Sequence, residues 1–97
     1  MNDDTPLVSV IIPSYNRAQF IERALNSVRA QTYDNLEMIV VDDASSDDTE
    51  ERVAAMVLMD NRISYVRHLV NRGAQAARNT GVHKAKGDYI ALLDSDN

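Results

Sequence analysis

Two aspartates near the end of the chain, Asp94 and Asp96, follow directly after a short apolar segment. Because they are two positions apart, their carboxylates can bind the same divalent cation. A hard cation such as Mg²⁺ or Mn²⁺ is typically bound by one or two carboxylates together with the phosphate oxygens of a ligand. These residues therefore predict a metal-assisted site for a phosphate-bearing ligand.

Further polar residues follow two earlier apolar segments. Pro13 and Tyr15 come after the first segment, and Asp42 and Asp43 come after the second. Open α/β sheets bind ligands at the carboxyl ends of their strands. We therefore expect the acids to converge on one rim of a sheet, where a cation would relieve the repulsion between them. Arg78 is the nearest expected positive charge, and its guanidinium suits forked contact with phosphate oxygens.

Each of these residues also has a simpler interpretation when it is taken alone. The paired acids could be turn or capping residues, Asp-x-Asp triplets are common in surface loops, Tyr15 could pack, and Arg78 could be a solvated charge. His68 and His83 are isolated, and we assign both to structure or solvent. The clustering favours a site, because independent surface features would not all fall on one rim.

The elements that must position these residues alternate along the chain. Short β-branched segments alternate with longer amphipathic ones, which predicts an α/β fold with a mostly parallel sheet and right-handed crossovers. An Asn16 N-cap is expected before the first helix, and Ser45 or Ser46 before the second. The strands are expected at residues 8–12, 36–41, 63–66 and 89–93, and the helices at residues 17–31, after 45–46 and from 73 to 85.

Composition excludes several classes of function. The 97 residues suffice for one small domain, and the net charge of −5 argues against binding nucleic acid or anionic lipid. The chain has no cysteine, its longest apolar runs are about five residues, and its first residues are acidic, so a cytosolic protein is expected. No glycine-rich dinucleotide or P-loop motif is present, so a metal must neutralise the phosphates. Since the chain ends with its fourth strand, we expect a truncated domain whose open edge self-associates.

In combination, the motifs resemble family 2 of the nucleotide-sugar glycosyltransferases. The resemblance extends over essentially the whole chain, in order and at the family's spacing. The motifs are Val8 to Asn16, Ser27-Val28 with Gln31-Thr32-Tyr33, Val40 to Ser45, Asn71-Arg72-Gly73, Ala77-Arg78-Asn79 with Gly81, Gly87 to Ile90, and Asp94-Ser95-Asp96.

This resemblance implies the Rossmann-like N-terminal half of a GT-A fold, with four strands in the order 3-2-1-4 and three crossover helices. Carried over by position, Pro13 and Tyr15 would line the base pocket, and Asp43 would accept a hydrogen bond from the base. Asp42 would support the ribose or the loop, and Arg78 would lie near the base or diphosphate. The resemblance also assigns Asp94 to the ribose or sugar and to the metal, Ser95 to the nucleotide and Asp96 to the metal. Asn97 stands where the family often has a further aspartate.

The resemblance further implies an inverting, metal-dependent transfer of sugar from a nucleoside-diphosphate sugar to an acceptor hydroxyl. A UDP-sugar is the first expectation for the donor. The general base and most contacts to the saccharide or lipid-linked acceptor would lie beyond residues 1–97, so no catalytic residue is expected here and the fragment should be inactive alone. The full protein would be cytoplasmic or at the cytoplasmic face of a membrane. The alternatives are a noncatalytic α/β binding module and a receiver-type signalling domain; the latter conflicts with Pro13 after the first strand and Arg67 ending the third.

Overall fold

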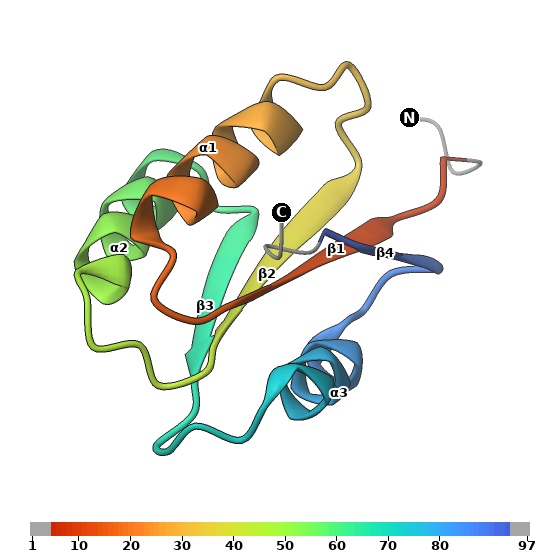
Figure 1. Ribbon diagram of the computed structural model, residues 1–97. Helices are drawn as coiled ribbons and strands as arrows, with labels where there is room; N and C mark the ends of the chain where they lie inside the picture. The colour runs from red at the N-terminus through yellow and green to blue at the C-terminus, as the bar shows by residue number, and fades with distance from the viewer. Residues whose placement is uncertain (1–4, 94–97) are drawn as a thin grey trace.

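Four strands and three helices alternate along the chain (Figure 1). The structure is a computed structural model, and it describes residues 5–93. All strands are parallel and lie in one sheet in the order β3-β2-β1-β4, which confirms the predicted fold class and strand order. In chain order the elements are β1 (Val8–Ser14), α1 (Ala18–Arg29), β2 (Leu36–Asp42), α2 (Thr49–Met59), β3 (Ile63–Arg67), α3 (Ala74–Lys84) and β4 (Tyr89–Leu92).

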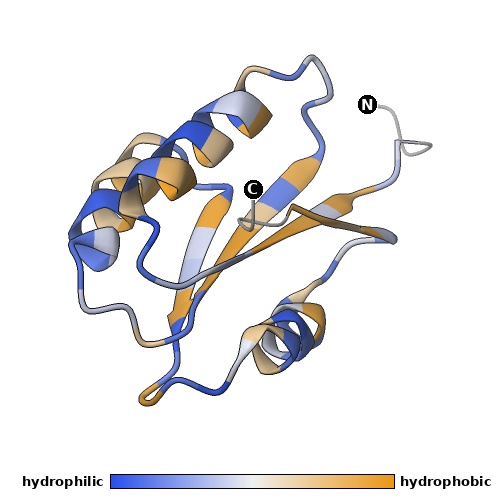
Figure 2. Cartoon of the chain, viewed as in Figure 1, coloured by the Kyte–Doolittle hydropathy of each residue, from blue (hydrophilic) through white to orange (hydrophobic). Residues whose placement is uncertain are grey.

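Helices cover both faces of the sheet, α1 and α2 on one face and α3 on the other (Figure 1). Successive side chains of a strand point to opposite faces, so Val10 and Ile12 pack with α1 and α2. Ile11 points to α3, where it faces Gly81 closely enough that a Cβ there would overlap the Ile11 side chain. The apolar character of the central strands is visible in Figure 2. The site residues therefore extend from a strand framework that is packed on both sides.

Helix α1 forms around one apolar stripe. Ile21, Ala24 and Leu25 recur at the helical spacing and are buried against the sheet. The expected Asn16 N-cap is wrong, because the helix begins two residues later and its N-cap residue is Arg17, whose side chain makes no capping bond. Asn16 has a φ of 52°, and its Oδ1 accepts hydrogen bonds from the next crossover instead, from the backbone N–H groups of Ser46 and Asp47.

Helix α2 begins later than the sequence predicted. Neither Ser45 nor Ser46 caps it, because the helix starts at Thr49. Asp47 bonds the first residues of both helices: its Oδ1 accepts from Thr49 N–H at 3.1 Å, and its Oδ2 accepts from Ala18 N–H at 3.2 Å. Burial alone would raise the pKa of Asp47, but the hydrogen bond from the Thr49 hydroxyl and these two N–H bonds outweigh it and lower the pKa below 3.8. The loops after β1 and β2 are thus joined to each other.

Strand β4 differs from the other strands in its exposure. It pairs with β1 from Val8 opposite Tyr89 to Ile11 opposite Leu92, yet all four of its residues are exposed. The apolar pattern of this strand is that of a buried strand, but the residues that the structure describes leave it uncovered. The reason is that α3 packs against β1 and β2, while α1 and α2 pack over β1, β2 and β3. Among residues 5–93, no helix has the length and apolar character needed to cross a membrane.

Candidate functional site

The carboxyl ends of β1, β2 and β3 meet at one rim, and their loops are bonded to one another. Beyond the paired residues Ser14 and Asp42, the backbone N–H of Asp43 donates to Ser14 O at 2.8 Å. On the other side of β2, the N–H of His68 donates to Asp42 O at 2.9 Å. The hydroxyl of Ser45 accepts from Asn16 N–H at 2.8 Å. This rim is where open parallel sheets bind ligands.

Asp42 is fully buried and has protein partners for both carboxylate oxygens. Its Oδ1 accepts from Ser45 N–H at 2.8 Å, and its Oδ2 accepts from the Tyr65 hydroxyl and from Arg67 Nη1 at 3.2 Å. Burial and the bond to this carboxylate raise the pKa of Tyr65 well above its usual 10. A buried charge is stable only with such partners. The bond from Ser45 N–H holds the loop after β2, while the predicted role of Asp42 in a nucleotide site stays a prediction.

Asp43 points to a different group of donors, contributed by the segment between β3 and α3. Its Oδ1 accepts from His68 Nδ1 and from Arg72 N–H, both at 2.8 Å, and its Oδ2 accepts from Gly73 N–H at 2.8 Å. Burial alone would raise the pKa of Asp43, but the bonds from Arg72, His68 and Gly73 outweigh it and lower the pKa below 3.8. The side chain is therefore an oriented carboxylate anion at neutral pH.

A carboxylate has about four acceptor positions, and residues 5–93 supply three bonds to Asp43, so within this part of the chain one position on Oδ2 has no partner. Asp43 can thus accept one more hydrogen bond from a ligand without losing a protein partner. The side chain is almost fully covered in this structure, with 4% of the residue exposed. The predicted contact between Asp43 and a base N–H is chemically compatible with this arrangement.

His68 is part of this site, although its position in the sequence gave no sign of it. The sequence assigned it to structure or solvent, and it is buried with both ring nitrogens bonded. Its Nδ1 contacts Asp43, 25 residues earlier, and its Nε2 lies 2.8 Å from Thr80 Oγ1 on α3. No periodicity or motif connects residues at these separations. The other isolated histidine, His83, is exposed near the end of α3.

The remaining described residues of the predicted site lie around this rim. Pro13 is buried within β1, opposite Val41 of β2. Tyr15 follows β1 directly and is 48% exposed, so part of its ring surface is open to contact. Arg78 lies half-buried in α3, one turn beyond the residues that contact Asp43. The structure thus brings Pro13 and Tyr15 to the end of β1 and Asp43 to the neighbouring loop, while their predicted contacts with a nucleotide stay predictions.

The predicted metal ligands, Asp94 and Asp96, lie outside the described residues, and so does Ser95. Leu93 is the last described residue, and its N–H donates to Ile11 O at 2.9 Å beside the central strand. Within residues 5–93, no group of three or more histidine, cysteine or acidic side chains could hold a metal. The predicted convergence of four acids includes Asp94 and Asp96 and therefore lies outside the described residues; Asp42 and Asp43 themselves have hydrogen-bond donors as partners.

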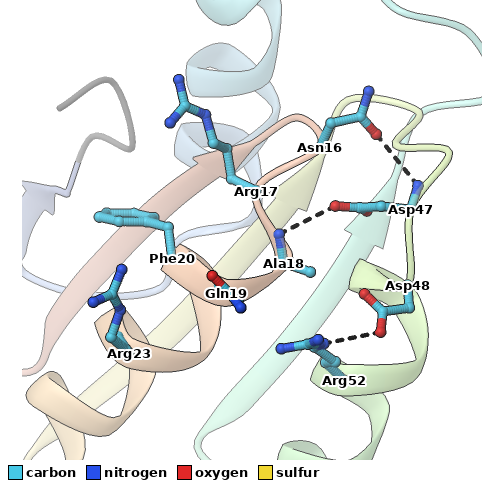
Figure 3. A pocket seen from close by; sticks show the side chains of 9 residues that line it. All are labelled: Asn16, Arg17, Ala18, Gln19, Phe20, Arg23, Asp47, Asp48 and Arg52. Atoms are coloured by element: carbon cyan, nitrogen blue, oxygen red, sulfur yellow. Dashed lines mark hydrogen bonds and ion pairs between the residues drawn. The ribbon is translucent and has the colours of Figure 1, made fainter.

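A shallow pocket of about 380 Å³ lies between the starts of α1 and α2 (Figure 3). It is lined by Asn16, Arg17, Ala18, Gln19, Phe20, Arg23, Asp47, Asp48 and Arg52. The helix starts at this pocket already have an anionic partner in Asp47. Arg52 is likewise ion-paired, to Asp48 at 3.0 Å and to Glu22 at 3.0 Å. Of the predicted site residues that the structure describes, none lines this pocket.

Two unusual features at the rim were not predicted. Ala44, directly after the acid pair, has a φ of 67°, a left-handed conformation that is uncommon for residues with a Cβ. Ser14 has a buried hydroxyl, and among the described side chains it is the fully buried polar group that has no hydrogen-bond partner. Both are concentrated where β1 and β2 end, as backbone strain and unpaired polar groups often are at functional sites.

Comparison with known proteins gives consistent matches. The sequence model of glycosyl transferase family 2 matches residues 9–97. The glycosyltransferase TuaG of Bacillus subtilis, named for teichuronic acid biosynthesis, is 44% identical over 97 residues, which is all of this chain and 38% of TuaG. Glycosyltransferase GlyG of Streptococcus pneumoniae is 38% identical over 91 residues, which is 94% of this chain and 30% of GlyG.

A solved structure with the same fold is that of the mannosyltransferase PcManGT from Pyrobaculum calidifontis, determined in complex with GDP-Man and Mn²⁺. It is 34% identical, with a TM-score of 0.88 over 97% of this chain and 28% of PcManGT. The chain therefore spans less than two fifths of the length of each of these proteins.

Proposed function

The chain belongs to glycosyl transferase family 2, and we propose that it binds the sugar nucleotide for an enzyme that transfers sugar to an acceptor hydroxyl. The observation that carries this proposal is the Asp43 carboxylate. It is ionised, oriented by three protein donors and left with one open acceptor position at the carboxyl end of β2. Such a group binds an N–H donor of a ligand rather than a phosphate, which it would repel.

The nucleoside would lie across the ends of β1 and β2. The half-exposed ring of Tyr15 offers a surface on which a base can stack, and buried Pro13 keeps the start of that loop rigid. Asp43 would accept the base N–H. Asp42 would act only by supporting the loop, because it is completely buried and both of its oxygens have partners.

The diphosphate would lie toward α3 and the end of β4. Arg78 would contribute positive charge there, and Ser95 would contact the nucleotide. We propose that Asp94 and Asp96 bind Mn²⁺ or Mg²⁺, since paired carboxylates suit these ions; the chain reaches Asp94 one residue after Leu93, whose backbone is bonded to β1. PcManGT, which has this fold, was solved with Mn²⁺ and GDP-Man. Such an ion stabilises the charge of a departing nucleoside diphosphate.

The rest of the reaction needs residues beyond this chain. In the whole enzyme, the acceptor hydroxyl would attack the anomeric carbon as the nucleoside diphosphate leaves, with inversion, and a general base would take the hydroxyl proton. We propose that the base and the saccharide or lipid-linked acceptor site belong to further polypeptide, and that residues 1–97 transfer no sugar alone. Strand β4 has an exposed apolar surface formed by Tyr89, Ile90 and Leu92. Such a surface supports the proposal that further polypeptide or a second copy of the chain covers it.

Thermal unfolding with UDP, GDP and dTDP tests this proposal, each nucleotide being added with Mn²⁺, with Mg²⁺ or with a chelator. A ligand at a hundred times its Kd adds about 2.7 kcal/mol of stability, which gives a measurable shift in Tm. UDP is expected to give the largest shift. Asp96→Ala should remove the metal-dependent part, and Asp43→Ala should weaken nucleotide binding with or without metal.

Asp34→Ala is a matched control, because Asp34 is exposed and lies at the opposite end of β2. It should leave the nucleotide-dependent shift unchanged. If no nucleotide shifts the Tm, or if Asp43→Ala and Asp96→Ala both respond like the parent chain, the proposed site is wrong. Sugar transfer by the purified chain would contradict the proposed inactivity.

A further inference from the structure

We propose that His68 and Thr80 are positioning residues. They orient Asp43 to accept a hydrogen bond from a ring N–H of the base, such as N3–H of uracil or N1–H of guanine. The inference rests on the proposed function, because it concerns the same nucleotide site. It adds two residues that the motifs do not mark, one in the loop after β3 and one on α3. Neither residue needs to contact the nucleotide itself.

The direction of the hydrogen bonds supports this role. A carboxylate only accepts, so the proton of the 2.8 Å contact between the ring and Asp43 must be on His68 Nδ1. In the neutral ring, Nε2 is then an acceptor, and the Thr80 hydroxyl 2.8 Å away donates to it. The Asp43 carboxylate thus fixes the tautomer, and Thr80, by bonding the second ring nitrogen, holds the ring in the orientation that donates to Asp43.

The contact to His68 also determines which oxygen remains available. Together with Arg72 N–H it occupies Oδ1, whereas Oδ2 has only Gly73 N–H. Without the histidine bond, the carboxylate would be held only by two backbone N–H groups from adjacent residues, and rotation about its Cβ–Cγ bond would cost less. The open acceptor position would then no longer have one direction, and pre-organisation for the ligand would be lost.

The structure also connects the orientation of the Asp43 carboxylate to helix α3. Thr80 lies two residues after Arg78 and next to Gly81, which packs directly against Ile11 of β1. The row Asp43–His68–Thr80 thus extends from the end of β2 to a part of α3 that is held against the sheet. A loop carboxylate is in this way held by a rigid element, as accurate binding requires.

Two substitutions separate the two nitrogen contacts of His68. The amide nitrogen of Asn occupies the position of Nδ1, so His68→Asn retains a donor for Asp43. The amide of Gln corresponds to Nε2, so His68→Gln retains the contact with Thr80 and loses the donor. Thr80→Val removes the hydroxyl at constant shape, and His83→Gln is the matched control on an exposed histidine of α3.

The experiment measures the Kd of UDP and of N3-methyl-UDP with Mn²⁺ for the full 97-residue chain and each variant, by calorimetry. The methyl group removes the N–H donor and leaves the ribose and diphosphate unchanged. A hydrogen bond to a charged group corresponds to a preference of about tenfold or more, so the parent chain should prefer UDP by about that factor. His68→Gln should lower the preference to about threefold or less, Thr80→Val should lower it partly, and His68→Asn and His83→Gln should retain it.

If the role of His68 and Thr80 is purely structural, their substitutions should lower stability in urea unfolding and weaken the binding of both nucleotides equally. The preference for UDP would then be unchanged, and that result would overturn the inference. So would a parent chain that binds UDP and N3-methyl-UDP equally, although nucleotide binding itself would then stand. A parent chain that binds neither compound would overturn the inference for uracil nucleotides, and it would overturn the proposed function as well if GDP and dTDP also fail to shift the Tm. If His68→Gln does not fold, Thr80→Val decides: an unchanged tenfold preference contradicts the positioning role.

Discussion

The end of β2 and the whole of β4 both lead into acids of the predicted site, but their surroundings differ. Strand β2 lies between β1 and β3, is covered by helices on both faces, and ends in two carboxylates with protein partners. Strand β4 pairs with β1, and all four of its residues are exposed. The acids at the end of β2 therefore have their partners within the described residues, whereas β4 has an uncovered surface.

The physical reason for the difference is the cost of burying charge. Two carboxylates at the end of a buried strand are stable only if the fold supplies donors for them. Here the donors to the two acids come from separate segments. Tyr65 on β3 donates to Asp42, and Gly73 at the start of α3 donates to Asp43. The donors that stabilise Asp43 at this end of the sheet are thus the groups that orient it for the proposed ligand. On β4, no comparable requirement acts on the described residues.

The largest effect is expected for Asp42→Ala, which would break the network at the end of β2. The substitution leaves Tyr65, Arg67 and Ser45 N–H without their acceptor. Removing one partner of a buried ionic network should cost about 3 kcal/mol of unfolding free energy, measured by urea denaturation. Asp48→Ala is the control, because the ion pair of Asp48 is on the surface and should contribute less than about 1 kcal/mol. Equal effects of the two variants would contradict this account of the β2 end.

A matched pair of leucines in strands compares the two regions directly. Leu36, at the start of β2, is buried, whereas Leu92, on β4, is 55% exposed. Leu36→Ala should destabilise the chain by about 2 to 3 kcal/mol through lost burial and a residual cavity. Leu92→Ala should change stability by less than about 0.5 kcal/mol. A large loss for Leu92→Ala would show that β4 is covered in solution, for example by a second copy of the chain.

The contact between α3 and the central strand is tested by Gly81→Ala. A Cβ at this position would overlap the Ile11 side chain, which is fully buried and β-branched and so has little room to move. We expect a loss of about 2 kcal/mol from overpacking, although alanine favours a helix over glycine by about 1 kcal/mol. Val82→Ala, on the exposed side of α3, is the control. Stabilisation by Gly81→Ala would mean that α3 does not approach β1 this closely.

The smallest effect is expected at the unpaired hydroxyl of Ser14. Because that hydroxyl is buried without a partner, Ser14→Ala should raise the unfolding free energy by about 1 kcal/mol. Ser9 is the matched control in the same strand, since it is equally buried but bonds Glu37 and Gly87 N–H at 2.6 and 2.8 Å. Ser9→Ala should therefore destabilise the chain by about the same amount. A shared loss for both variants would show that Ser14 has a partner in solution.

Sequence reasoning predicted the order of the elements well, because hydrophobic periodicity differs between strands and helices. It was less accurate at the helix starts, where Asn16 bonds the loop after β2 rather than α1. That error has a physical cause: the same side-chain oxygen can accept from its own helix or from a neighbouring loop, and local spacing does not distinguish the two. The apolar pattern of β4 does not by itself show whether another element covers the strand, since the pattern is the same in either case.

The parallel strands, and the meeting of Pro13, Tyr15 and Asp43 at one rim, followed from residue types and their spacing along the chain. These features depend on local preferences and on the limited ways in which alternating strands and helices connect. The partners of each acid were decided only in three dimensions. His68, Arg72 and Gly73 lie 25 to 30 residues from Asp43, and they reach it because β3 lies beside β2 and α3 begins where β3 ends. Contacts between such distant residues leave no periodic signal in the sequence.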